Sequence, residues 1–200
     1  GLGGVCLNWG CIPSKSLLKN AELVNQIKDS DKWGISFDNV SFDFAKAISR
    51  SRDVSKQLTQ GIEYLVKKNK ITLFKDTASL SGDNSIKLLN SGEFINSKNV
   101  IIATGARPRN LPNLEIDGEM IISSREALEL KKLPKSIGII GAGAIGAEFA
   151  YLFNAYGVEV KMFEAQSHLV PNEDKSISTE LEKIFSSKGI TFELNSTVAG

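Results

Sequence analysis

The sequence predicts an α/β fold, on three observations. Residues 136–163 have the pattern of a strand, a glycine-rich turn, a helix and a second strand, a unit of about the expected length for β-α-β. Apolar residues recur at helical spacing over 14–26, 41–70 and 174–188. Short strand-like runs separated by turn residues occupy 71–103. Strands that alternate with helices favour a parallel sheet covered by helices.

The composition excludes several classes of protein. The chain has 200 residues, of which 42% are apolar and 24% are charged, and its formal net charge is +1. This balance argues against disorder and against a broad basic surface for nucleic acid. No apolar run approaches the roughly 18 residues that a membrane helix needs. We therefore expect one or two globular domains, with neither nucleic acid nor membrane as a partner.

The first half of the chain predicts two helices and several short strands. The glycine-rich residues 1–12 favour a loop, and Pro13 suits the first residue of the first helix. The second helix is expected to begin near Ser41 or Asp43, either of which can serve as its N-cap. Strands are then predicted over 71–74, 78–80, 86–89, 93–95 and 100–103. The last of these is a continuous apolar run, as in a strand buried on both faces.

A glycine motif of the form G-x-G-x-x-G opens the helix of the β-α-β unit. The strand 136–140 leads into residues 141–146 (GAGAIG), a helix is predicted over 144–156, and a second strand over 158–163. In this setting the glycines allow a tight turn, close approach of a pyrophosphate to the backbone, and close packing of helix on strand. The helix N-terminus favours the anion. The pattern predicts a Rossmann-like, doubly wound dinucleotide site; the alternative is a tight turn without a ligand.

An acidic residue, Glu164, follows the second strand of this unit. A carboxylate at that point accepts hydrogen bonds from the ribose hydroxyls of the adenosine and repels a 2′-phosphate. The sequence therefore favours NAD over NADP. A helix over 174–188 and a strand over 190–194 continue the alternation.

Cys6 and Cys11 are the two cysteines of the chain, and four residues separate them. They lie at the start of a predicted helix, where the helix dipole stabilises a thiolate and lowers its pKa. From this spacing alone, a redox-active pair and two ordinary half-buried cysteines are equally compatible. A structural zinc site is excluded, because the chain offers two cysteines and one histidine. The chain shows no signal-peptide pattern, so a reducing compartment, the cytoplasm, is expected.

The cysteine segment resembles the active-site signature of a known family. Residues 3–15 (GGVCLNWGCIPSK) are similar to the redox-centre motif of the pyridine nucleotide–disulfide oxidoreductases, and residues 16–22 extend the match. Ala103-Thr104-Gly105 fits the second flavin motif of that family, and residues 141–148 fit its NAD motif. The resemblance covers essentially the whole chain. Within the family it is greatest to the enzymes that reoxidise dihydrolipoyl groups.

The resemblance implies how the chain is divided. Residues 1–110 would form part of an FAD-binding domain with a redox-active disulfide, and residues 111–200 the N-terminal part of an NAD-binding domain. Both Rossmann-like domains would be incomplete, and we expect the chain to be a fragment. The first flavin fingerprint, the C-terminal dimerisation domain and its catalytic His–Glu pair would lie outside it. A cluster of proline, asparagine and glycine over 107–118 fits the boundary.

The resemblance also implies roles for individual residues. Cys6 would exchange with the dithiol substrate, and Cys11 would lie against the flavin. Lys15 would stand near the flavin N5 atom with Glu148 as its ion-pair partner, although by themselves both are typical solvated helix residues. The residues expected to bind FAD are Lys15, Ala78, Thr104, Gly105 and Ala106. The residues expected to bind NAD are Gly141, Ala142, Gly143, Ala144, Ile145, Gly146, Ala147, Glu148 and Glu164.

Three positions depart from the usual pattern of the family. Ala78 falls where many members have a glycine beside the adenine half of FAD, and Asp76 also replaces a common glycine. Trp9 stands between the cysteines where many members have valine. Of these, the alteration at Ala78 weakens the expectation of a flavin contact, whereas the one at Trp9 does not by itself require any change in the cysteine chemistry.

The implied reaction passes electrons from a protein-bound dihydrolipoyl group to a Cys6–Cys11 disulfide, then to FAD and to NAD⁺. The implied partner is the lipoyl-bearing acyltransferase of the 2-oxoacid dehydrogenase complexes, and the full-length enzyme would be a homodimer. The fragment alone would be inactive. The alternatives are a glutathione- or mercuric-reductase-like enzyme of the same family, or a non-catalytic NAD-binding redox module. Glu164 argues against a glutathione reductase, because those enzymes typically use NADP.

Overall fold

A three-stranded parallel sheet organises the C-terminal half of the chain. In this computed structural model, which describes residues 1–198, strands β4 (Ser136–Ile140), β5 (Glu159–Phe163) and β6 (Thr191–Glu193) pair in that order. Helix α5 (Ala144–Ala155) connects β4 to β5, and helix α6 (Lys175–Ser187) connects β5 to β6. Parallel strands joined by helices are the arrangement that the β-α-β pattern predicted, and the predicted bounds are correct to within one or two residues.

Burial in this sheet follows the side-chain alternation of a strand. Val160 and Met162 of β5 are buried, while Glu159 and Lys161 are exposed, because successive side chains point to opposite faces. The buried residues of α5 are Phe149, Ala150, Leu152, Phe153 and Ala155. The apolar residues that recur at helical spacing in the sequence therefore form the face of α5 that packs on the sheet.

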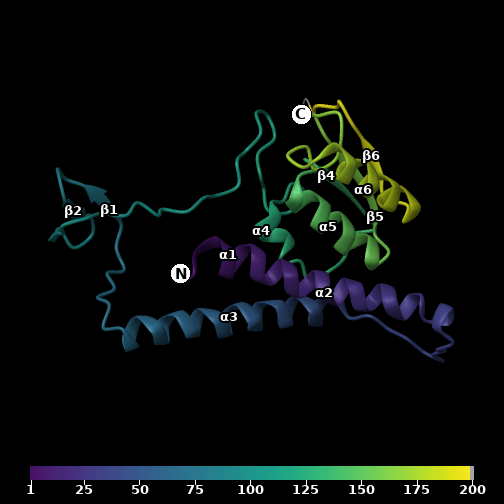
Figure 1. Cartoon of the computed structure of the whole chain (residues 1–200), viewed down its shortest axis with the longest axis horizontal. Helices are drawn as coiled ribbons and strands as arrows, with labels where there is room; N and C mark the ends of the chain where they lie inside the picture. Colours follow the sequence, from purple (N-terminus) through teal and green to yellow (C-terminus); the bar gives the residue numbers. More distant parts are fainter. Residues whose placement is uncertain (199–200) are drawn as a thin grey trace.

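Two long helices are the main elements of the N-terminal half. Helix α1 (Gly4–Trp9) leads through Gly10 into α2 (Cys11–Lys28), and α3 (Phe44–Lys68) follows with Asp43 as its N-cap. Figure 1 shows α2 lying between α3 and α5, and residue contacts join it to both. No helix in residues 1–198 combines the length and the apolar character needed to cross a membrane.

One buried cluster holds these helices and the sheet together. Leu17 and Ala21 of α2 are 0% exposed and join Phe149 of α5 in this cluster. Phe44 of α3 adds an edge-on contact with Tyr156, with 5.0 Å between ring centroids. A fully buried aliphatic side chain contributes about 1.5–3 kcal/mol to stability. Packing within this shared cluster is therefore the main interaction between the two halves.

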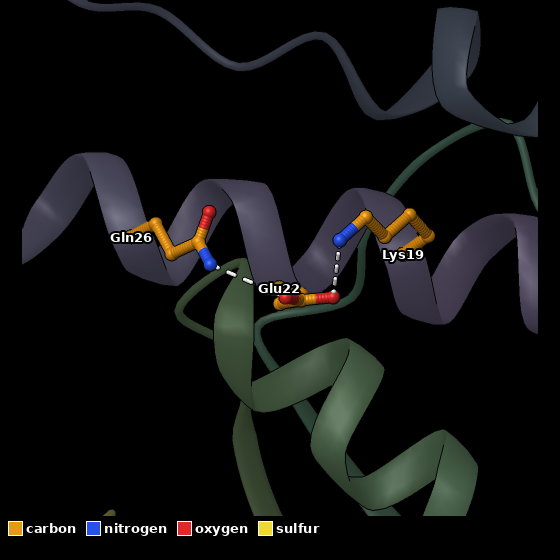
Figure 2. A network of polar contacts seen from close by, with 3 residues as sticks. All are labelled: Lys19, Glu22 and Gln26. Atoms are coloured by element: carbon orange, nitrogen blue, oxygen red, sulfur yellow. Dashed lines mark hydrogen bonds and ion pairs between the residues drawn. The ribbon is translucent and has the colours of Figure 1, made fainter.

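The side of α2 away from the core carries polar pairs (Figure 2). Lys19 donates to Glu22 at 2.8 Å, and Gln26 donates to the other oxygen of the same carboxylate at 3.2 Å. Pairs at spacings of three and four residues stabilise a helix by about 0.2–0.5 kcal/mol each. They support the helix, whereas its placement comes from the buried face.

Two short helical elements were not expected from the sequence. A 3₁₀ turn, η1 (Ser30–Trp33), follows α2, and α4 (Ser124–Ala127) precedes β4. Ser123 and Glu126 form a capping box at α4. The Ser123 hydroxyl oxygen accepts a hydrogen bond from the Arg125 backbone N–H, and the Glu126 carboxylate accepts one from the Ser123 backbone N–H. The S-x-x-E spacing was therefore a readable signal for this helix.

A small antiparallel sheet lies apart from the rest, at the end of extended segments (Figure 1). It consists of β1 (Ala78–Leu80), β2 (Ser85–Leu88) and β3 (Phe94–Asn96), with β2 in the centre. The carboxylate of Asp76 holds the turn between β2 and β3 by accepting hydrogen bonds from backbone N–H groups. The hydrogen bond from the Asn90 N–H contributes most to lowering the Asp76 pKa. The three strands are those predicted, each within one residue.

Two predicted strands are absent from the described residues, and this corrects the sequence analysis. Residues 71–74 and 100–103 have neither helix nor strand structure, and Ile101 is 90% exposed rather than buried on both faces. An apolar run forms a strand only where a neighbouring strand offers hydrogen-bond partners, and no strand of residues 1–198 lies alongside either segment. The C-terminal half of α3 is likewise exposed, at Leu58 and Leu65.

The loop predicted over residues 1–12 is also corrected, because residues 4–9 form α1 and α2 begins at Cys11. Pro13 is thus the third residue of its helix, still within the first turn where its missing N–H costs nothing. Asn8 explains α1 in part, since its amide donates to the backbone oxygens of Leu2 and Gly4, both at 2.9 Å.

We predict that Leu17→Ala lowers the free energy of unfolding of the full-length protein by about 2–5 kcal/mol, because it opens a cavity between α2 and α5. Urea denaturation measures the change. Leu23→Ala is the matched control on the same helix: Leu23 is 46% exposed, so its loss should cost no more than about 0.5 kcal/mol. Equal effects of the two substitutions would contradict the assigned packing.

Candidate functional site

The two cysteines meet at the junction between α1 and α2. Gly10 connects the helices with φ −144° and ψ −120°. A Cβ at this position would lie 3.1 Å from the Val5 oxygen and 3.3 Å from the Cys6 Cα. Glycine therefore lets α1 fold back closely on the start of α2. As a result Cys6, within α1, and Cys11, the first residue of α2, come within hydrogen-bonding reach as free, exposed thiols.

The shared hydrogen bond changes the acidity of Cys6. The side-chain hydrogen bond with Cys11 raises the pKa of the Cys6 thiol, and the backbone N–H of Cys11 opposes this only in part. The sequence had predicted a lowered pKa from a helix N-terminus. For Cys6 that prediction is wrong, because this residue lies inside the short helix α1 and faces the second thiol.

Lys15 and Glu148 form an ion pair although they are 133 residues apart in the chain. Lys15 lies one turn after Cys11 on α2, and Glu148 lies on α5. Their side chains are 64% and 30% exposed, and exposed pairs contribute only about 0–1 kcal/mol. The pair therefore results from the packing of α2 on α5, and its cation lies on α2 one turn after Cys11. The roles of both residues toward a flavin and a nicotinamide stay predictions.

The glycine loop has the geometry that each of its glycines was expected to provide. Gly141 has φ +94°, a backbone conformation that a side chain would strain. At Gly146 a Cβ would lie 2.0 Å from the Gly141 oxygen, so the helix packs closely on the turn. At Gly143 a Cβ would meet nothing within 4 Å, so this glycine faces open space.

This open space lies at the N-terminus of α5. Gly143 is the N-cap of that helix, and no side chain caps it. The unpaired N–H groups there are suited to a pyrophosphate, and the residues present fit a bound dinucleotide. Of the other expected NAD residues, Ala142 is buried, Ala144 and Ile145 are exposed, and Ala147 is half-buried.

Glu164 has a structural contact that the sequence did not indicate. This residue is 8% exposed, and its carboxylate accepts hydrogen bonds from the backbone N–H of Ala142 at 2.7 Å and of Gln166 at 2.9 Å. The end of β5 is thus tied to the glycine loop. The predicted contact with ribose hydroxyls stays a prediction, since each carboxylate oxygen can accept a second hydrogen bond.

The remaining expected flavin residues are not brought to the cysteines. Ala78 begins β1, and Thr104, Gly105 and Ala106 lie in the extended segment that follows β3. All four are exposed, and among residues 1–198 no hydrogen bond or ion pair joins them to the cysteine segment. Cys11 and Lys15 can therefore face one part of a flavin, whereas the described residues form no closed cradle for the rest.

We predict that Cys11→Ala increases the alkylation rate of Cys6 in the reduced full-length protein at neutral pH. Loss of the hydrogen bond lets the Cys6 pKa fall toward its ordinary value, and a lower pKa means more thiolate below that pKa. Iodoacetamide labelling across a pH series, read by mass spectrometry, measures the change. Cys11→Ser, which retains a hydroxyl, should raise the rate less. A slower Cys6 in Cys11→Ala would overturn this account.

Three curated proteins similar to this chain share the name dihydrolipoyl dehydrogenase. Dihydrolipoyl dehydrogenase of Chlorobaculum parvum is 41% identical over 195 residues, which cover 96% of this chain and 42% of that protein. The enzyme of Bacillus subtilis with the same name is 39% identical over 202 residues, covering 96% and 43%. That of Mycobacterium tuberculosis is 44% identical over 193 residues, covering 94% and 41%. The chain thus spans less than half the length of these relatives.

Solved structures agree with the fold. LpdA from Mycobacterium tuberculosis matches with a TM-score of 0.90 at 25% identity, over 100% of this chain and 45% of that one. The flavoprotein disulfide reductase RclA from Escherichia coli, described as induced by HOCl, matches with a TM-score of 0.81 at 30% identity, over 98% and 41%. The family profile described as pyridine nucleotide-disulphide oxidoreductase matches residues 1–200. Since this match covers the cysteine pair, the glycine loop and all that lies between them, the chain belongs to the pyridine nucleotide–disulphide oxidoreductase family.

Proposed function

We propose that the full-length protein is a dihydrolipoyl dehydrogenase, which reoxidises protein-bound dihydrolipoyl groups and reduces NAD⁺. The observation that carries this proposal is the joint placement of the cysteine pair, Lys15 and the β4-α5 glycine loop through the packing of α2 on α5. This arrangement supports a reaction that uses both an exchangeable dithiol and a bound dinucleotide. Relatives of that name at 39–44% identity support this choice of substrate.

The cysteine chemistry balances as two thiol–disulfide exchanges. One thiolate of the dihydrolipoyl group attacks the Cys6 sulfur of a Cys6–Cys11 disulfide and releases Cys11 as a thiolate. The second substrate thiol then attacks its neighbour's sulfur in the mixed disulfide and releases Cys6. The substrate leaves as the cyclic disulfide, and its two electrons remain on the cysteine pair.

The chemistry that bound FAD supplies is two-electron transfer from the reduced cysteine pair to NAD⁺. Cys11 and Lys15 are the residues of this chain that would face it, because both are exposed on the first turns of α2. The ammonium group of Lys15, oriented by Glu148, would stabilise negative charge there. The glycine loop would hold the pyrophosphate of NAD, and Glu164 would disfavour the 2′-phosphate of NADP.

A second candidate is a disulfide reductase with a different substrate, of the glutathione- or mercuric-reductase type. The similarity to RclA, itself described as a flavoprotein disulfide reductase, supports this second candidate. A buried carboxylate at Glu164 argues against a reductase that depends on NADPH. A non-catalytic NAD-binding redox module is the third reading, and it would leave the exposed pair of thiols without a role.

Partners and location follow from the proposed reaction. The lipoyl-bearing acyltransferase of a 2-oxoacid dehydrogenase complex would deliver the substrate, because the lipoyl group is attached to that protein. The full-length enzyme would act as a homodimer in the cytoplasm. An exposed Cys6 on a short helix suits a substrate that arrives on a long arm.

We expect Cys6→Ser and Cys11→Ser each to lower dihydrolipoamide-dependent NADH formation by roughly 10³-fold or more, since the two sulfurs act as one unit. The full-length flavoprotein is titrated anaerobically with dihydrolipoamide and then NAD⁺, and NADH absorbance is read. A wild-type protein that NADH reduces but dihydrolipoamide does not would favour the second candidate. Unchanged turnover in Cys11→Ser would remove the catalytic reading altogether.

For the dinucleotide site we expect Gly143→Ala to weaken NAD⁺ binding by about 10–100-fold, because a methyl group would displace a charge-assisted backbone hydrogen bond. Isothermal calorimetry on the full-length protein measures the affinity. The added methyl meets no protein atom within 4 Å, so the melting temperature should not change. Gly146→Ala is the contrasting variant and should lower the melting temperature, since its methyl meets backbone at 2.0 Å. Wild-type affinity in Gly143→Ala would argue against a pyrophosphate at this loop.

A further inference from the structure

Trp9, between the two cysteines, contacts two arginines from different parts of the chain. The guanidinium carbon of Arg52, on α3, lies 4.3 Å from the centroid of the Trp9 ring. That of Arg125, on α4, lies 4.2 Å from the same centroid. Cation–π contacts at such distances contribute about 0.5–2 kcal/mol each. The reaction proposed above does not use any of these three residues.

Helix α1 lacks the usual means of holding its place. It has six residues, none of them buried, and no side chain caps its N-terminus. A helix this short is unstable by itself, since helices under about 12 residues are marginal in water. Its position must therefore come from contacts with other elements.

Those contacts converge on Asn8 and Trp9. Arg52 donates a hydrogen bond to the Asn8 backbone oxygen at 2.6 Å, and Thr59 donates to the Asn8 side-chain oxygen at 3.4 Å. Arg125 reaches the Trp9 ring from the short helix before β4. The last two residues of α1 are thus anchored by polar and cation–π contacts from α3 and α4.

The two cysteines are therefore held in different ways. Cys11 belongs to α2, whose Leu17 and Ala21 are fully buried, so the core fixes its position. Cys6 belongs to α1, so its distance from Cys11 depends on the anchor at the end of that helix. We propose that Trp9, held by Arg52 and Arg125, is a positioning residue that keeps Cys6 within bonding reach of Cys11 and thereby stabilises their disulfide.

This proposal rests on the proposed function only in taking Cys6 and Cys11 as a redox pair. Two thiols held together have a high effective concentration, which favours the intramolecular disulfide over the dithiol. Release of α1 lowers that concentration and makes the disulfide easier to reduce. The sulfur chemistry is otherwise unchanged: two electrons and two protons convert the disulfide to two thiols, with dithiothreitol as the reductant.

The test is the redox equilibrium of the cysteine pair in the full-length holoenzyme, without NAD. The protein is equilibrated anaerobically in dithiothreitol redox buffers and alkylated, and the two cysteines are quantified by mass spectrometry. Trp9→Val should shift the equilibrium about tenfold toward the dithiol, or about 30 mV for two electrons. Trp9→Phe keeps an aromatic face and should restore most of the wild-type value. Trp33→Phe, at a 79% exposed tryptophan remote from the pair in sequence, should not change it.

A second variant keeps the test decisive if Trp9→Val fails to fold. Arg125 is exposed, and Arg125→Lys retains the charge but loses the flat guanidinium that stacks on the ring. It should shift the equilibrium in the same direction by a smaller factor. A wild-type equilibrium in Arg125→Lys and in folded Trp9→Val would overturn the positioning role.

The outcome separates the two proposals. A wild-type pair that forms no disulfide in any buffer overturns both. A disulfide whose stability is unaffected by loss of the Trp9 ring overturns this inference and leaves the proposed function intact. A tenfold shift in a protein that does not oxidise dihydrolipoamide supports the inference and overturns the proposed function.

Discussion

The packing of α2 on α5 is the interaction on which the rest of the structure depends. Leu17 and Ala21 contribute fully buried side chains to the same core as Phe149 and Phe153. The arrangement of the two sequence motifs follows from this contact, because it packs the helix that begins at Cys11 on the helix that follows the glycine loop. The Lys15–Glu148 ion pair is a consequence of it, since an exposed pair is too weak to bring two helices together.

The two cysteines lie on helices that are anchored in different ways. Cys11 and Lys15 lie on a helix fixed by the core, whereas Cys6 lies on a six-residue helix joined to it by Gly10. A dithiol that must exchange with a large substrate needs one accessible sulfur and one fixed sulfur. In the reaction we propose, the difference in anchoring between α1 and α2 would supply the fixed sulfur and the more freely placed one, although both residues are cysteines and both are exposed.

The sequence predicted those parts of the fold whose determinants are local. The unit from β4 through α5 to β5 was correct because a glycine turn, an apolar helix face and an alternating strand each occur within a few residues. Residues 71–74 and 100–103 were wrongly predicted as strands, since a strand also needs a partner, which no local pattern supplies. The helical state of residues 4–9 was missed for the same reason, because its anchors, Arg52 and Arg125, lie far along the chain.

By itself the sequence determined the chemical groups: two cysteines with four residues between them, a lysine one turn later, three glycines in a turn and an acid after the next strand. For the three glycines, residue type alone predicts a tight turn at the first, open space for a ligand at the second and close helix packing at the third. The structure agrees at all three. The family resemblance had predicted that Glu148 pairs with Lys15, and the structure has this pair. Only the tertiary structure decided that Glu164 binds the glycine loop and that a hydrogen bond raises the Cys6 pKa. Such contacts join residues that burial of a distant apolar face brings together, so no short stretch of sequence contains them.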